Sequence, residues 1–227
     1  AFASVIKTDA EHPAGDIAKA PPSAWPPGRP AYAMPREAGG DKRPGFRHEL
    51  AAVLALLDLL RQVDPFHAAL LGPWRAYGLA DVSGAKNNPD ACVSPVQRRL
   101  AELDAESFNL LLYLIAAHHG KVRTGFQAVP ADQEHPVASE GDAMPIRGIM
   151  DGDRIPSIRV TDGTVGVSRI PETVLSLEPA AMGLSPRTGA SWMERCGALL
   201  QRHGPFVLAW MEALLRAADI RVSKAIN

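Results

Sequence analysis

The chain has 227 residues, a length that fits one domain of above-average size or a core domain with one long insertion. Hydrophobic residues make up 46% of it, an ordinary share for a globular protein with a sizeable core. Its 24 Lys and Arg against 25 Asp and Glu give a formal net charge of −1, so overall charge does not favour non-specific nucleic-acid binding. A local basic patch or a bound metal could still hold a polyanion.

Cysteine usage and hydropathy predict a reducing compartment and no membrane partner. Cys92 and Cys196 form no CxxC pair and are expected to be free thiols. No apolar run approaches the roughly 18–20 residues that cross a bilayer. The chain begins at Ala1 with neither an initiator Met nor a charged leader, so we expect a cytoplasmic, excised or processed domain.

The N-terminal part of the sequence contains one irregular segment and one strong helix. Residues 9–45 are rich in Pro, Gly and Ala, which predicts an irregular connector. Residues 46–63 are expected to form a helix that Asp64-Pro65 ends, because their apolar positions repeat at helical spacing. Those positions are Leu50, Val53, Leu54, Leu57 and Leu60.

Two further helices follow in the middle of the chain. Ser94-Pro95, a cap followed by proline at the first helical position, predicts a helix to about residue 103. Asp104 can cap the next one, from residue 105 to about 119, which Gly120 ends. That helix is apolar almost all round, which is typical of a helix central to its domain.

Residues 129–189 have a different character, because Gly, Pro and Asp separate short β-like runs. The Asp162-Gly163 step between two such runs favours a hairpin, and we interpret the region as an insertion carrying a small β-element. Helices then return with a capping-box pattern at residues 191–194 and continue to about residue 203. Gly204-Pro205 precedes a last helix over residues 206–222. The expected architecture is one mainly α domain.

The histidines are the strongest candidates for chemistry. His118 and His119 lie at the end of the most apolar helix, just before Gly120. Adjacent helical residues point about 100° apart. The pair is therefore expected to serve two neighbouring metals, or to supply one ligand and one hydrogen-bonding group. The alternative is a pair of histidines that only caps the helix C-terminus.

His48 and Asp219 are further candidates. His48 opens a helix whose other face is core, and Asp219 falls in an apolar stretch where an isolated buried carboxylate would be costly. Imidazole and carboxylate ligands from three helices suit Mn, Fe, Co, Ni or Zn. The basic residues nearby could contact phosphate or be solvated charges: Arg47, Lys121 and Arg123. The remaining histidines are not expected to be ligands: His12, His67, His135 and His203.

Common catalytic motifs are absent from the sequence. It contains no Walker A loop, GxGxxG, HExxH, GxSxG or zinc-ribbon spacing. These absences exclude an ATPase motor, a dinucleotide enzyme and the common hydrolase classes.

Two segments resemble motifs of a known family: Gly45-Phe46-Arg47-His48-Glu49-Leu50 and Ala116-Ala117-His118-His119-Gly120-Lys121-Val122-Arg123. They look like motifs of the HD nuclease domain of type I CRISPR-associated helicase–nucleases, most of all the branch long called type I-U. The stretch from residue 191 to Asp219 resembles the end of that branch, where an acidic residue closes the site. The likeness covers about residues 45–123 and 190–223.

The resemblance implies an HD-domain-like helical phosphohydrolase fold and a nuclease of antiviral CRISPR interference that cleaves single-stranded DNA. It matches His48, His118, His119 and Asp219 to the family's metal ligands and puts Lys121 near the scissile phosphate. One or two divalent metals, such as Mn, Ni, Co, Fe or Mg, would activate a water as nucleophile and clamp the phosphate oxygens. The implied partners are single-stranded DNA, a helicase domain of the same or a partner chain, and a CRISPR effector complex.

The family's name-giving His-Asp dipeptide is missing from this chain. In the family it precedes the segment that matches residues 45–50. We expect it to lie upstream of Ala1, so that this chain is truncated and holds an incomplete metal site. Two alternatives stay open: an HD-type phosphohydrolase acting on nucleotides or cyclic nucleotides, and a catalytically inactive interaction domain.

Overall fold

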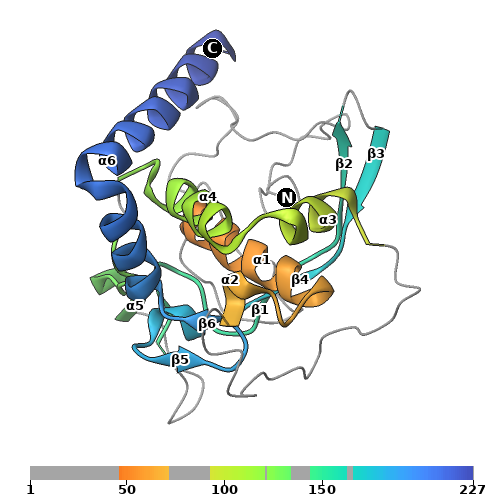
Figure 1. Ribbon diagram of the computed structural model, residues 1–227. Helices are drawn as coiled ribbons and strands as arrows, with labels where there is room; N and C mark the ends of the chain where they lie inside the picture. The colour runs from red at the N-terminus through yellow and green to blue at the C-terminus, as the bar shows by residue number, and fades with distance from the viewer. Residues whose placement is uncertain (1–45, 72–92, 121, 134–143, 163–165, 227) are drawn as a thin grey trace.

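The computed structural model describes residues 46–71, 93–120, 122–133, 144–162 and 166–226. Within these ranges the chain is mainly helical, with small antiparallel sheets at its side (Figure 1). The helices are α1 (His48–Val63), α2 (Ala68–Leu71), α3 (Pro95–Glu102), α4 (Ala105–Ala117), α5 (Pro130–Gln133), the 3-10 helix η3 (Glu178–Ala180) and α6 (Trp192–Ile226). The predicted connector at residues 9–45 and Cys92 lie outside the described residues.

Helix α1 forms where the leucine pattern predicts it. Its apolar stripe is buried, and each leucine removed from water in this way contributes about 2 kcal/mol. The predicted stripe is confirmed by exposed fractions of 0–2% for Leu50, Val53, Leu54, Leu57 and Leu60. Asp64 ends the helix, and its backbone N–H donates to the carbonyl of Leu60. Because the stripe is anchored in the core, the first residue of α1, His48, has a fixed position.

Helices α3 and α4 begin at the predicted caps. Ser94 and Gln97 form a reciprocal capping box on α3, and Asp104 accepts the backbone N–H of Ser107 at 2.7 Å on α4. Helix α4 ends at Ala117, slightly earlier than predicted, with His118 as its C-cap. It buries Phe108, Leu112, Tyr113, Ala116 and Ala117, whereas Leu110, Leu111, Leu114 and Ile115 are partly buried.

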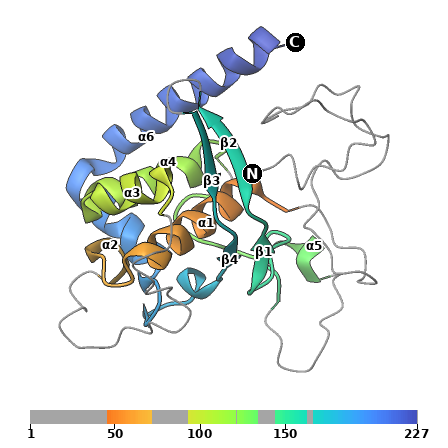
Figure 2. The ribbon, with the colours of Figure 1, turned by 90° about the vertical axis from the view of Figure 1, so that its right-hand side faces the viewer.

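The predicted β-element is confirmed and is larger than expected. Strands β2 (Ile158–Asp162) and β3 (Gly166–Ile170) form the expected antiparallel pair, which runs upward from β1 and β4 in Figure 2. Two other pairs lacked a clear sequence signal: β1 (Asp153–Ile155) with β4 (Thr173–Leu175), and β5 (Leu184–Ser185) with β6 (Gly189–Ala190). Strand β4 packs against α1.

Helix α6 has the predicted capping box and the predicted break. Ser191 and Glu194 exchange hydrogen bonds at its start, and Gly204, with φ 74° and ψ 159°, interrupts the helical backbone before Pro205. The C-terminal end of α6 projects beyond the other helices (Figure 1). Within the described residues, no helix combines the length and the apolar character that a membrane span requires.

A buried arginine ties the helices and the small sheets together. Arg195 on α6 is 3% exposed, and its guanidinium donates to the side chain of Asn109 on α4. It also donates to four carbonyls, those of Ala69, Leu70, Thr188 and Ala190. A buried cation with this many acceptors is satisfied without a carboxylate partner. The neighbouring Cys196 is a buried free thiol, as predicted.

Asp132 fixes the loop beside the start of α1. Its carboxylate accepts the backbone N–H groups of Val129, Arg147 and Gly148 at 2.7–2.8 Å. These bonds hold Arg147 at an unusual positive φ of 51°. The carbonyl of Arg147 in turn accepts the backbone N–H of Arg47 at 3.1 Å. The residue preceding His48 is therefore tied to the insertion.

Replacing Gly189 by Ala should strongly destabilise the protein. Gly189 has φ 73°, and a Cβ there would overlap the backbone carbonyl of Leu70, which cannot move aside as a side chain could. We expect a loss of about 3 kcal/mol or more in the free energy of unfolding, measured by denaturant titration. Gly183→Ala is the control, since its φ is 97° but nothing lies within 4 Å, so about 1–2 kcal/mol is expected. Equal losses in the two variants would contradict this packing.

Candidate metal centre

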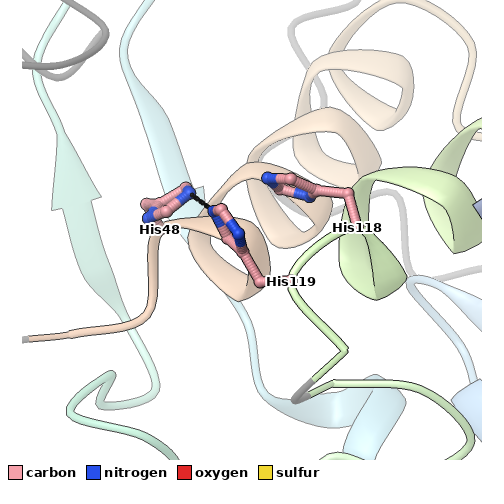
Figure 3. A group of neighbouring side chains, drawn as sticks. All are labelled: His48, His118 and His119. Carbon is pink, nitrogen blue, oxygen red and sulfur yellow. Dashed lines mark hydrogen bonds between the residues drawn. The ribbon is translucent and has the colours of Figure 1, made fainter. Parts of the chain in front are cut away.

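Three histidines meet where the start of α1 lies beside the end of α4 (Figure 3). His48, His118 and His119 each offer one ring nitrogen, and these three atoms lie within 4.8 Å of one another. All three residues are half-buried. The structure thus brings together three of the four residues that the sequence predicts as metal ligands.

The rings of the adjacent histidines lie close together and near that of His48. The ring centroids of His118 and His119 are 3.8 Å apart, and they lie 5.7 and 4.7 Å from that of His48. His118 keeps helical backbone angles as the C-cap of α4, and His119 lies in the turn that leads to Gly120, whose φ is 70°. Both rings therefore approach His48 from the end of α4.

Hydrogen bonds orient the imidazoles. The Nδ1–H of His118 donates to the carbonyl of Ile115 at 2.6 Å, which leaves its Nε2 with a lone pair. The Nε2 atoms of His119 and His48 lie 2.9 Å apart in a direct hydrogen bond, so one of them donates to the other (Figure 3). One of these two Nε2 atoms therefore carries a proton, and the other, like Nε2 of His118, presents a lone pair to the same small region.

The spacing of the Nε2 atoms of His48 and His119 fits a divalent transition metal. Imidazole nitrogens bind such an ion at about 2.0–2.1 Å, so two of them lie about 3.0 Å apart at a right angle and about 3.4 Å apart at a tetrahedral angle. The observed 2.9 Å is close to the first value. An ion bound there would take the place of the hydrogen bond between His48 and His119.

Burial keeps two of the imidazoles neutral. Desolvation, the largest cause, lowers the pKa of His48 to about 4, aided by His119, His118 and Arg47 and opposed by Glu49. Desolvation also lowers the pKa of His119, followed by the effect of His118, while Glu49 and Asp219 oppose the shift. At neutral pH both rings are uncharged, which is the form that binds metals.

Asp219 lies near this group but is not part of it. Its residue is half-buried in the second half of α6, and its negative charge raises the pKa of His119. Its carboxylate oxygens are not among the atoms gathered within 4.8 Å. Lys121, the predicted catalytic residue, lies outside the described residues.

The two basic residues flanking the site are engaged with carboxylates. Arg47 donates to Glu49, and Arg123 lies 3.0 Å from Glu212, which also accepts the hydroxyl of Tyr113. Arg123 remains 57% exposed and could still reach a phosphate. Burial, followed by this bond to Glu212, raises the pKa of Tyr113 above its ordinary value.

Glu49 is the residue near the site that sequence reasoning missed. It is 0% exposed, and one of its oxygens lies 3.6 Å from Nδ1 of His48. Its spacing to Val53 and Leu57, four and eight residues on, places it on the buried face of α1. This helical spacing could have identified Glu49 from the sequence, because a carboxylate on a leucine-rich face needs a partner.

The other described histidines have separate partners. Nδ1 of His67 accepts the backbone N–H of Ala69 at the start of α2, and His203 lies 3.3 Å from a carboxylate oxygen of Glu106. Neither belongs to the three-histidine group. His12 and His135 lie outside the described residues.

Comparison with family models, with curated proteins and with solved structures gives no match.

Acidification should destabilise the protein through His48. Its folded-state pKa of about 4 lies below the ordinary 6.5, so the unfolded chain takes up a proton where the folded chain does not. The stabilisation is fully present above about pH 6.5 and is lost as the pH falls toward 4, by on the order of 1–3 kcal/mol. Urea titrations across this pH range measure the free energy of unfolding and so check the prediction. His48→Gln should show a shallower pH dependence, and an unchanged slope would contradict the assignment.

Proposed function

We propose that this chain is an HD-domain-like nuclease domain, a divalent-metal-dependent phosphodiesterase that cleaves single-stranded DNA. The observation that supports the proposal is the convergence of His48, His118 and His119 within 4.8 Å. They lie far apart in the sequence, and the resemblance of residues 45–50 and 116–123 selects the same three as ligands. A mainly helical chain is compatible with the fold proposed.

Each residue of the proposed site would have its own role in binding a metal. His118 is oriented by its hydrogen bond to Ile115, and His48 and His119 present Nε2 atoms to the same region. The charge of Asp219 favours a cation beside His119, and Asp219 is the proposed fourth ligand. These residues would hold a divalent ion, whose chemistry would be to activate a water for in-line attack and to neutralise charge on the phosphate. Lys121 is proposed to contact the scissile phosphate.

The proposed biological setting rests on the resemblance alone. In it, a helicase domain of the same or a partner chain delivers single strands to this domain within a CRISPR effector complex. The formal net charge of −1 favours a contact with DNA through a bound metal rather than through a broad basic surface.

The proposal predicts metal-dependent cleavage of a labelled single-stranded oligonucleotide with Mn²⁺, Ni²⁺ or Co²⁺. His118→Ala should reduce the rate by on the order of 100-fold or more, because it removes an oriented ligand. His203→Ala is the matched control and should retain activity, since His203 lies outside the three-histidine group.

The assay should include the chain together with any residues that precede Ala1 in its natural protein. No cleavage with any divalent metal in that longer chain would contradict the proposal. Clear preference for a mononucleotide over single-stranded DNA would assign a nucleotide phosphohydrolase instead.

A further inference from the structure

Glu49 is a fully buried carboxylate beside the three histidines, and the proposed function leaves it unused. Its side chain is 0% exposed. Arg47 holds one of its two oxygens: Nε and an Nη nitrogen donate to Oε1 at 2.8 and 2.6 Å. This contact compensates the charge of the carboxylate and fixes its orientation.

The second oxygen of Glu49 receives no hydrogen bond from the part of the chain that the structure describes. Among the described residues, Oε2 is buried and accepts none. Buried carboxylate oxygens are normally satisfied, so this one calls for a partner. It lies 3.6 Å from Nδ1 of His48, slightly beyond hydrogen-bond range, so a small rotation of the imidazole would close the contact.

The two nitrogens of His48 face different groups. Nε2 lies 2.9 Å from Nε2 of His119, on the side of the proposed metal, and Nδ1 lies toward Glu49. A neutral imidazole carries its proton on one nitrogen only. Nε2 can bind a metal only if the proton is on Nδ1, and that N–H then needs an acceptor.

We propose that Glu49 is a positioning residue: its Oε2 accepts the Nδ1 proton of His48 and so keeps Nε2 unprotonated and directed at the metal site. Arg47 contributes by holding Oε1, which leaves only Oε2 for the imidazole. Glu49 is not a ligand in this account, because its oxygens lie outside the group within 4.8 Å. The inference rests on the proposed metal centre.

The same arrangement already exists at His118, with a different acceptor. There the carbonyl of Ile115 accepts the Nδ1 proton and leaves Nε2 available. Glu49 would accept the Nδ1 proton of His48, just as the carbonyl of Ile115 accepts that of His118. Two ligands from two helices would then share one tautomer, with Nε2 free on both.

The variant Glu49→Gln tests this directly. Arg47 would keep the amide oxygen at the Oε1 position, so the amide NH₂ would take the place of Oε2 and donate to Nδ1 of His48. The imidazole would then carry its proton on Nε2. Two-bond ¹H–¹⁵N NMR correlations on the metal-free protein at about pH 8, where histidine is neutral, report which nitrogen is protonated.

We expect an Nδ1–H tautomer of His48 in the wild type and an Nε2–H tautomer in Glu49→Gln. Affinity for Mn²⁺ or Ni²⁺, measured by calorimetric titration, should fall about 10–100-fold in the variant. Glu212→Gln is the matched control, since Glu212 is also buried and paired with an arginine but lies outside the histidine group. It should leave the His48 tautomer unchanged.

A wild-type His48 protonated on Nε2 would overturn the inference, and this holds even if Glu49→Gln does not fold. An unchanged tautomer in a folded Glu49→Gln would also overturn it. If the tautomer changes as expected but neither protein binds metal, Glu49 positions His48 and the proposed function fails instead.

Discussion

The contact between the start of α1 and the end of α4 is the constraint on which the candidate site depends. His48 can meet His118 and His119 only because the leucine stripe of α1 is packed into the core. That packing partly buries the imidazoles and lowers the pKa values of His48 and His119, so both rings stay neutral with lone pairs available. Burial and ligand chemistry are therefore two consequences of one packing arrangement.

Two buried polar residues outside the three-histidine group support this contact. Asp132 holds the loop whose Arg147 carbonyl accepts the backbone N–H of Arg47, next to His48. Arg195 links α6 to α4 and to the carbonyls that follow α1. In both cases a buried charge is matched by several hydrogen bonds, which fixes geometry that apolar packing alone would leave loose. The insertion thus supports the site although it supplies none of the three histidines.

Much of the helical structure could be predicted from the sequence, because its signals are local. The caps at Ser94, Asp104 and Ser191 and the break at Gly204 each depend on residues within one turn. The pairings of β1 with β4 and of β5 with β6 were missed, since these two- and three-residue strands are too short for a clear alternation. Their pairing depends on tertiary contacts.

The candidate site was predicted in its residue types and only partly in its geometry. The grouping of His48 with His118 and His119 followed from the family resemblance, since spacing cannot show that two helix ends meet. The close approach of the two adjacent rings could not be predicted, because it depends on the turn that follows α4. Glu49 was missed because an acidic residue in the first helical turn usually only complements the helix dipole.

X-ray absorption spectroscopy of the Co²⁺-loaded protein tests the central claim most directly, because imidazole rings give outer-shell scattering that water and carboxylate do not. We expect scattering from two or three imidazoles, lost in part when any of His48, His118 or His119 is replaced. A Co²⁺ environment of oxygen ligands alone, unchanged by those replacements, would contradict it.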